Sequence, residues 1–339
     1  TVLTPANAES KCVGCHTSTP DGVFTAVSSS QDASNGGIAS VDVRAVEGAA
    51  RPAFITPAAL ALLGRTSQFA PSYSAAHWAP GDRFGLSMRD VAGKTEILWT
   101  NLEATSEAQG EGWGVLPRGE DPGAAAGAVF SHDGSKVVYT AAPVVSSGTV
   151  TSGGDIRIVP YANRAGGKSV AVAGASDPAF HEFYPSFSAD DALLAFNRVP
   201  QNPSFPPETI DLDASRNPNT SYNNPAAEVF VVPSAGGTAT RLAANDPPAC
   251  VKRTSPGLTN SWPKWSPEVK TAGTTKYYFL VFSSIRRGRE RAPQLYVAPV
   301  LVDGAGAVRT YPALYLWNQP EDENNHTPAW DVFKLPAPK

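Results

Sequence analysis

The stretch Tyr184-Pro185-Ser186-Phe187-Ser188-Ala189-Asp190-Asp191 decides the fold of this chain. Its first half alternates apolar and polar residues as a short strand does, and its second half holds the serine and aspartate residues that favour tight turns. The apolar run at 193–196 follows as a second strand. The same order of aromatic strand, turn and second strand recurs at 77–88, 128–140 and 262–283.

A third strand follows each of these pairs, and a weaker fourth strand often comes after it. The third strands are expected at 97–99, 156–159, 229–232 and 295–297. A four-stranded unit that repeats along a chain is typical of a β-propeller, because each small sheet hides its faces only against the neighbouring sheets. The sequence therefore predicts an all-β fold.

The two ends of the chain indicate how the ring closes. Near the start, the turn Pro20-Asp21-Gly22 leads into strands at 23–28 and 38–43 without a preceding inner strand, whereas the end of the chain offers an inner-strand motif at 326–331 without a blade. We therefore expect residues 327–333 to complete the first blade. This gives a propeller of five blades over 20–339, with six blades as the alternative, and a separate segment at 1–19.

These repeats resemble the WD40-like repeats of TolB-type propellers, with inner strands such as Tyr184-Pro185-Ser186-Phe187-Ser188. The resemblance extends from about residue 73 to residue 333 and implies a propeller. It rests on the recurring pattern and not on any single diagnostic residue.

Composition agrees with this fold and excludes several classes of protein. The 339 residues include 29 glycines and 31 prolines, which disfavour helices. Hydrophobic residues make up 42%, enough for a large core, and the net charge of −4 disfavours nucleic acid as a partner. No apolar run reaches 18 residues, so no transmembrane helix is predicted. The start at Thr1 leads us to expect a mature chain without its signal peptide.

The motif that carries chemistry is Cys12-Val13-Gly14-Cys15-His16. A zinc site needs two more ligands nearby, a thioredoxin-like pair needs a βαβ context, and a disulfide at this spacing is sterically poor. The motif resembles the C-x-x-C-H haem-attachment motif of c-type cytochromes. The resemblance implies one haem c, bound through Cys12 and Cys15, with His16 as the proximal iron ligand. Since the motif precedes the Pro20-Asp21-Gly22 turn, we expect the haem at one mouth of the propeller.

The sixth iron ligand has several candidates in the sequence. His326 comes first because ring closure places it beside the 12–16 segment, and His181 and Met88 follow. His77 and His132 are expected to be structural or exposed, and a five-coordinate iron stays open. Cys250 has no assigned role, and the basic cluster at 286–291 is expected to be a solvated loop rather than a docking site for propionates or partners.

Three functions compete on this evidence. The first is an electron carrier, and not an enzyme, that works with a redox partner protein or a larger assembly. The second is a haem enzyme or small-ligand sensor with an open iron, and the third is an interaction scaffold with a structural haem. Covalent haem attachment implies the bacterial periplasm, cell surface or exterior. The oligomeric state has no indication in the sequence.

Overall fold

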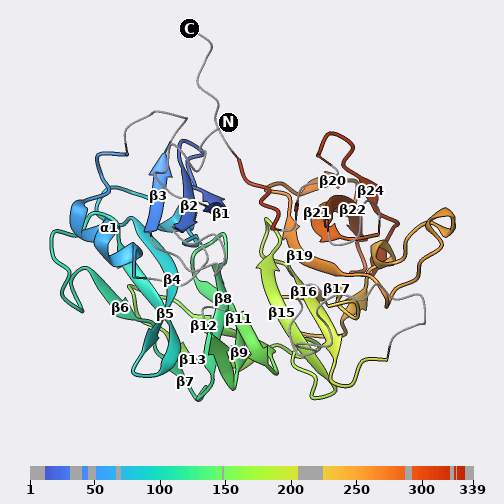
Figure 1. The fold of residues 1–339 in the computed structure, drawn as a ribbon, viewed down its shortest axis with the longest axis horizontal. Helices are drawn as coiled ribbons and strands as arrows, with labels where there is room; N and C mark the ends of the chain where they lie inside the picture. The colour runs from blue at the N-terminus through green and yellow to red at the C-terminus, as the bar shows by residue number, and fades with distance from the viewer. Residues whose placement is uncertain are drawn as a thin grey trace, which may run out of the picture.

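A computed structural model describes residues 12–30, 40–44, 51–65, 70–146, 149–204, 224–286, 292–320, 324–325 and 327–332. Five antiparallel sheets of three or more strands follow one another along these residues and lie in chain order around an arc (Figure 1). We number them sheet 1 to sheet 5. The all-β expectation is confirmed; the number of blades stays a prediction.

The strands of the five sheets have the following bounds. Sheet 1 contains β1 (Cys12–Ser18), β2 (Thr25–Ser30) and β3 (Ser40–Arg44), and sheet 2 contains β4 (Phe84–Val91), β5 (Lys94–Asn101) and β6 (Trp113–Val115). Sheet 3 contains β8 (Ala124–Phe130), β9 (Lys136–Ala142), β12 (Asp155–Pro160) and β14 (Val170–Ala171). Sheet 4 contains β15 (Phe180–Phe187), β16 (Leu193–Pro200), β17 (Glu228–Pro233) and β18 (Thr240–Arg241). Sheet 5 contains β19 (Asn260–Trp265), β20 (Lys270–Ala272), β21 (Thr275–Ser284), β22 (Gln294–Val302), β23 (Val308–Thr310) and β24 (Leu314–Tyr315).

Short elements connect these sheets. The strands β7 (Arg118–Gly119) and β13 (Gly167–Lys168) pair in parallel, and β10 (Val144–Ser146) pairs with β11 (Thr149–Ser152). Helix α1 (Pro57–Leu63) begins where the Thr56 side chain accepts a hydrogen bond from Ala59 N. The single-turn helices are η1 (Ala75–His77), η3 (Ala243–Asn245) and η4 (Ala249–Val251). Among the described residues no helix has the length and hydropathy needed to span a bilayer.

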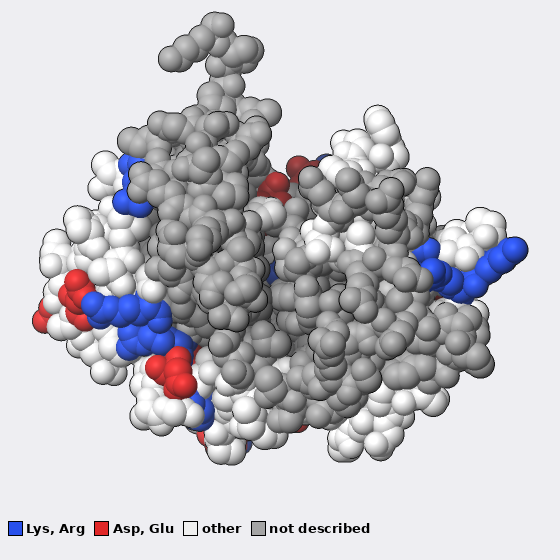
Figure 2. All heavy atoms as spheres, viewed as in Figure 1, with Lys and Arg blue, Asp and Glu red and all other residues white. Residues whose placement is uncertain are grey.

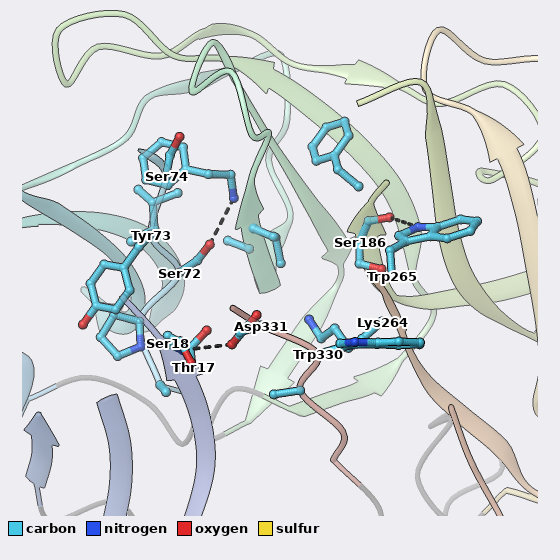
Figure 3. A pocket seen from close by; sticks show the side chains of 18 of the residues that line it. Thr17, Ser18, Ser72, Tyr73, Ser74, Ser186, Lys264, Trp265, Trp330 and Asp331 are labelled. Atoms are coloured by element: carbon cyan, nitrogen blue, oxygen red, sulfur yellow. Dashed lines mark hydrogen bonds between the residues drawn. The ribbon is translucent and has the colours of Figure 1, made fainter. Parts of the chain in front are cut away.

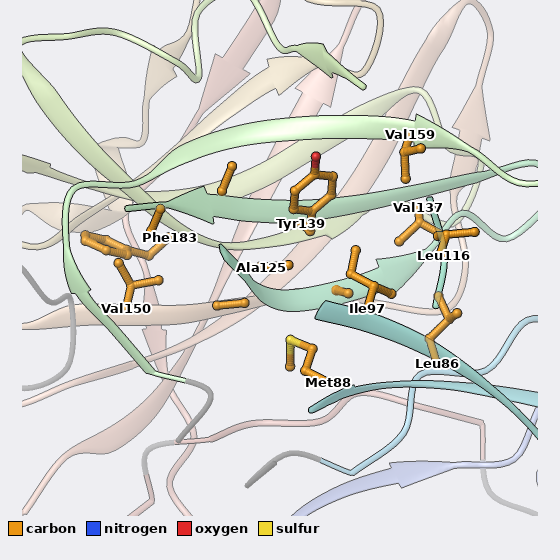
Figure 4. Packing of buried hydrophobic residues seen from close by; sticks show 14 of the residues in the cluster. Leu86, Met88, Ile97, Leu116, Ala125, Val137, Tyr139, Val150, Val159 and Phe183 are labelled. Atoms are coloured by element: carbon orange, nitrogen blue, oxygen red, sulfur yellow. The ribbon is translucent and has the colours of Figure 1, made fainter. Parts of the chain in front are cut away.

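The hydrophobic core is divided into layers between successive sheets. Sheets 2 and 3 share the largest cluster, in which Leu86 and Ile97 pack with Tyr139 (Figure 4). Similar clusters join the other neighbouring sheets: Ala26 with Trp78 and Leu102 for sheets 1 and 2, Val138 with Phe187 and Phe196 for sheets 3 and 4, and Leu193 with Val231 and Phe282 for sheets 4 and 5. Because every sheet buries its faces against its neighbours in the chain, the architecture is that of a β-propeller.

The recurring serine–aspartate turn has one hydrogen-bond pattern. In sheet 3, Ser131 Oγ donates to Asp133 (2.6 Å) and accepts from Lys136 N (3.0 Å), while Asp133 accepts from Ser135 N (2.9 Å). The same bonds form at Thr19, Asp21 and Phe24 in sheet 1 and at Ser188, Asp190 and Leu193 in sheet 4. The repeat recognised in the sequence is therefore a repeat of local hydrogen bonds.

The turns are also bonded from one sheet to the next. The Asp191 carboxylate of sheet 4 accepts from the backbone N–H of His132 (2.8 Å) and of Asp133 (2.9 Å) in sheet 3. Likewise, Trp78 Nε1 donates to Asp21 (2.9 Å) between sheets 2 and 1, and His77 Nε2 lies 3.0 Å from the Gly134 carbonyl oxygen between sheets 2 and 3. These bonds fix the sheets relative to one another at one end of the central channel.

The first sheet differs from the expectation of ring closure by residues 327–333. Its first strand is β1, which pairs with β2 from Cys12 to Ser18, so this part of the 1–19 segment belongs to sheet 1. The described residues 327–332 are not a strand; they meet β1 where Ser18 N donates to Asp331 (2.9 Å). The physical reason is that β2 already has β1 on one side and β3 on the other. β1 and the described residues 327–332 therefore lie side by side, and the strand beside β2 is β1.

Charged side chains of the described residues are interspersed on the face shown in Figure 2. On the left of the view in Figure 2, lysine and arginine lie beside aspartate and glutamate.

The hydrogen bonds between the turns of neighbouring sheets lead to a first prediction. Asp191→Ala is expected to lower the free energy of unfolding by about 2 kcal/mol, because two backbone donors lose a charged acceptor and alanine is strained at the φ of 57° that Asp191 adopts. Urea unfolding measures the effect. Asp191→Asn, which keeps an acceptor and tolerates this φ, is expected to lose less. Glu268→Ala, which removes only an exposed pair with Lys270, serves as the control and is expected to change nothing measurable. Equal stability of Asp191→Ala and Glu268→Ala would contradict the stabilising role that we give to the bonds between the turns.

Candidate functional site: a central pocket

One pocket of about 410 Å³ lies where the inner segments of all five sheets converge (Figure 3). Its walls are formed by residues 16–20 of sheet 1, 70–75 and 86–88 of sheet 2, 127–132 of sheet 3, 184–187 of sheet 4, 262–267 of sheet 5, and 327–332. In the figure, Ser18 and Asp331 lie on one wall and Ser186 and Trp265 on the opposite wall. The volume falls within the range of small-molecule and cofactor sites.

Three inner strands carry the same irregularity where they face this pocket. The pairing register shifts between Ala126 and Val129 in β8, between Phe183 and Ser186 in β15, and between Ser261 and Lys264 in β19. The residue at each β-bulge has a positive φ: 59° at Gly127, 53° at Tyr184 and 58° at Trp262. Glycine adopts this conformation freely, whereas a bulky side chain is strained there by about 1–2 kcal/mol.

The first sheet has a register shift at the cysteine–histidine motif as well, but without a positive φ among the described residues of β1. In β1 the register shifts between Gly14 and His16. Each bulge residue stands four positions before the serine or threonine of the following turn, namely Ser131, Ser188, Ser266 or Thr19. By this count, Cys15 occupies the backbone position that Tyr184 and Trp262 hold in sheets 4 and 5. The structure describes the backbone of Cys12 and Cys15, and both lie on the inner strand.

Tyr184 and Trp262 form a stacked aromatic contact at the pocket. Their rings stack with centroids 3.8 Å apart and planes at 16°. A proline follows each residue, and proline suits a bulge where no ladder N–H is needed. The fully buried Asn197 fixes the strained backbone: its Oδ1 accepts from Trp262 N (2.9 Å), and its Nδ2 donates to the Asn260 carbonyl oxygen (2.6 Å).

The His16 side chain lines the same pocket. It is accessible from the pocket, yet protein surrounds it closely enough that burial lowers the pKa of its imidazole, against the opposing effect of the Asp331 carboxylate. The ring is therefore neutral near pH 7, the state in which a histidine nitrogen binds a metal. Ser87 Oγ, on the sheet 2 wall, is buried and has no hydrogen-bond partner among the described residues, as expected where a bound group or a water completes the wall.

Some of the other candidate iron ligands line the pocket and others do not. Met88 lines the pocket from β4 and is 4% exposed. His132 lies at the rim, where its Nδ1 is 2.9 Å from Asp191. His181 is not among the lining residues; it lies beside Phe183, and His77 is engaged with Gly134 and Asp82. His326, the first candidate, lies outside the described residues, as does residue 333.

Two further residues of the sequence analysis lie away from the pocket. Cys250 is an exposed free thiol on η4. Arg286 is not solvated, contrary to expectation: it is 3% exposed and donates to Asn260 Oδ1 (2.6 Å) and to the Asn245 carbonyl oxygen (3.3 Å). Its long side chain reaches these acceptors in the interior because it lies at the end of β21, and residues 287–291 are outside the described part.

Sequence reasoning did not single out several lining residues, namely Tyr184, Trp262, Lys264, Trp265 and Trp330. Aligning the repeats on the turn serine and counting back four positions identifies the first two. Nothing in the local sequence distinguishes the others from core aromatics or surface lysines.

No family model matches the sequence, and no curated protein matches it. Solved structures resemble its fold. TolB from Acinetobacter baumannii is 14% identical with a TM-score of 0.44, over 90% of this chain and 55% of that chain. An oligogalacturonate lyase in complex with manganese is 14% identical with a TM-score of 0.40, over 89% and 67%. The endo-arabinase from Bacteroides thetaiotaomicron is 10% identical with a TM-score of 0.38, over 78% and 84%. The chain thus spans about half of the length of TolB, and the likeness concerns the fold alone.

A buried ion pair lies on β15 outside the pocket. Glu182 is completely buried, and its Oε1 accepts from Arg198 Nη2 (3.1 Å) and Nε (3.2 Å). Its Oε2 has no partner among the described residues. Burial raises the pKa of Glu182 to about 7, although the nearby Arg198 acts in the opposite direction.

This pKa predicts a pH-dependent stability. The folded-state pKa lies above that of the unfolded chain, so the folded protein holds the proton more tightly, and stability declines as the pH rises from about 4.5 to about 7. Urea unfolding at pH 5 and pH 8 is expected to show the wild type losing up to about 3 kcal/mol relative to Glu182→Gln, whose neutral amide cannot titrate. The same pH dependence in both proteins would contradict the assignment.

Proposed function

We propose that this chain is a monohaem c-type cytochrome that transfers electrons in the bacterial periplasm, at the cell surface or outside the cell. The observation that supports this most is the position of His16. The histidine of the C-x-x-C-H motif lies on the inner strand of sheet 1 and lines the central pocket together with Met88, whose thioether is a type of group that can ligate iron.

The chemistry of the pocket residues fits a haem. The imidazole of His16 is neutral and the Met88 sulfur is a soft donor, and these two groups form a common pair of axial ligands. Aromatic side chains suit a flat, largely apolar macrocycle, and the Lys264 ammonium on the wall suits carboxylates such as the haem propionates. Cys12 and Cys15 would hold the group through thioether bonds. When bound, the haem supplies one-electron redox chemistry.

The residues of this chain would control that chemistry in three ways. His16 would hold the iron from one side, and its neutral state would be kept by burial. The apolar walls would limit access of water, which is one of the factors that set the redox potential. The sixth ligand would come from Met88 within the described residues, or from His326 as the sequence favours. A redox partner protein or a larger assembly would dock on the outside.

Haem attachment is the direct test of the proposal. The chain is produced with a secretion signal and a cytochrome c maturation system, purified and denatured. We expect one haem per chain to remain attached, seen in the absorption spectrum and as added mass. Cys12→Ala combined with Cys15→Ala is expected to abolish covalent attachment. Cys250→Ala, which removes the third thiol by the same substitution, is the control and is expected to keep the haem attached. Colourless wild-type protein would overturn the proposal.

The sixth ligand is tested separately on the haem-loaded protein. If Met88 ligates the iron, Met88→Leu changes the spectrum from low spin to high spin and lowers the midpoint potential by roughly 100 mV or more, because a thioether favours the ferrous state. His181→Gln and His132→Gln are the controls and leave the spectrum unchanged. A high-spin spectrum in His326→Gln alone would instead assign that histidine. A high-spin wild type that binds CO would favour the open-iron sensor or enzyme.

A further inference from the structure

The stacked pair Tyr184–Trp262 occupies a conformation that its own strands do not require. In sheet 3 the same bulge position holds Gly127, which adopts a positive φ without strain and closes the strand equally well. Sheets 4 and 5 place the largest aromatic side chains there instead, at φ 53° and 58°. Strain that the surrounding structure holds in place points to a functional role for the residues concerned.

Several bonds hold the two rings where they are. Asn197 accepts from the strained Trp262 N–H. Between the two strands, Ser186 Oγ donates to the Pro263 carbonyl oxygen (3.1 Å), and Trp265 Nε1 donates to the Ser186 carbonyl oxygen (3.1 Å). β15 and β19 are thus bonded to each other next to the stack. The two rings are preorganised as one face-to-face stack on the wall of the pocket.

The stacked pair and the cysteine–histidine motif occupy equivalent positions along the inner strands of their sheets. Tyr184, Trp262 and Cys15 all lie four residues before the turn of their own sheet, and each sits at a register shift of an inner strand. Because equivalent positions of the repeated sheets lie at similar depth along the channel, a group held at Cys15 and His16 is at the depth of the stacked rings.

We propose that the stacked Tyr184–Trp262 pair is the platform on which the flat macrocycle attached at Cys12 and Cys15 rests, with Asn197 as the residue that positions it. This inference depends on the proposed haem attachment. Contact with the rings would exclude water from that side of the macrocycle and fix its orientation. Burial and orientation are two of the means by which a protein sets a haem potential.

The experiment compares haem-loaded variants by circular dichroism in the Soret band and by redox titration. We expect Trp262→Gly to lose most of the Soret dichroism and to shift the midpoint potential downward while the haem remains covalently attached. Trp262→Phe retains most of both signals. Asn197→Ala reproduces part of the loss, and an unchanged signal in it would overturn the positioning role. Trp317→Gly, which removes an indole that is 84% exposed, is the matched control and is expected to change neither readout.

A stability measurement tests the backbone strain at Trp262. If its φ of 58° is strained, Trp262→Gly unfolds at a higher urea concentration than Trp262→Ala, since only glycine relieves the strain. Attached haem with unchanged dichroism and potential in Trp262→Gly would overturn the platform and leave the proposed cytochrome intact. Absence of haem from the wild type would overturn both.

Discussion

A small antiparallel sheet has two faces to bury, and in this chain successive sheets cover each other's facing sides. Everything else in the structure depends on this constraint. It orders the core into layers, such as the one that joins Leu86 of sheet 2 to Tyr139 of sheet 3, and it turns one edge of every sheet toward a common centre. The inner segments then form the walls of a single pocket, although they are far apart in the chain.

Much of the fold was predictable because the deciding interactions are local. The bonds from Ser131 to Asp133 and from Lys136 to Ser131 span at most five residues, so the same letters recur wherever the turn recurs. The first strand was not predictable in this way. The sequence of β1, rich in small residues and cysteine, has none of the phenylalanine, tyrosine or tryptophan residues of the other inner strands, and its pairing with β2 is visible only in the structure. The Thr-Pro-Ala-Trp motif at 327–330 has the composition of an inner strand, but β1 already occupies the place beside β2.

The site was predictable in its chemistry and not in its shape. The C-x-x-C-H motif identifies a candidate cofactor site from five adjacent residues, and the fold adds that His16 and Met88, 72 positions apart in the numbering, line one pocket. The bulges escaped prediction because a positive φ is usually signalled by glycine, and Tyr184 and Trp262 give no such signal. His181 illustrates the opposite error: its place just before the inner-strand motif at Tyr184 suggested the channel mouth, yet alternation along the strand turns it toward Phe183.

The same backbone feature therefore serves two different purposes in neighbouring sheets. At Gly127 the bulge bends the inner strand without strain, and at Tyr184 and Trp262 it bends the strand and also carries a ring to the pocket wall. The buried Asn197 shows how the strain at Trp262 is sustained, because its amide bonds backbone groups of β19 and of β17. Glycine would adopt the positive φ at all three positions without strain. The aromatic pair, four residues before its turns as Cys15 is before its own, is the part of the wall that we propose the bound group contacts.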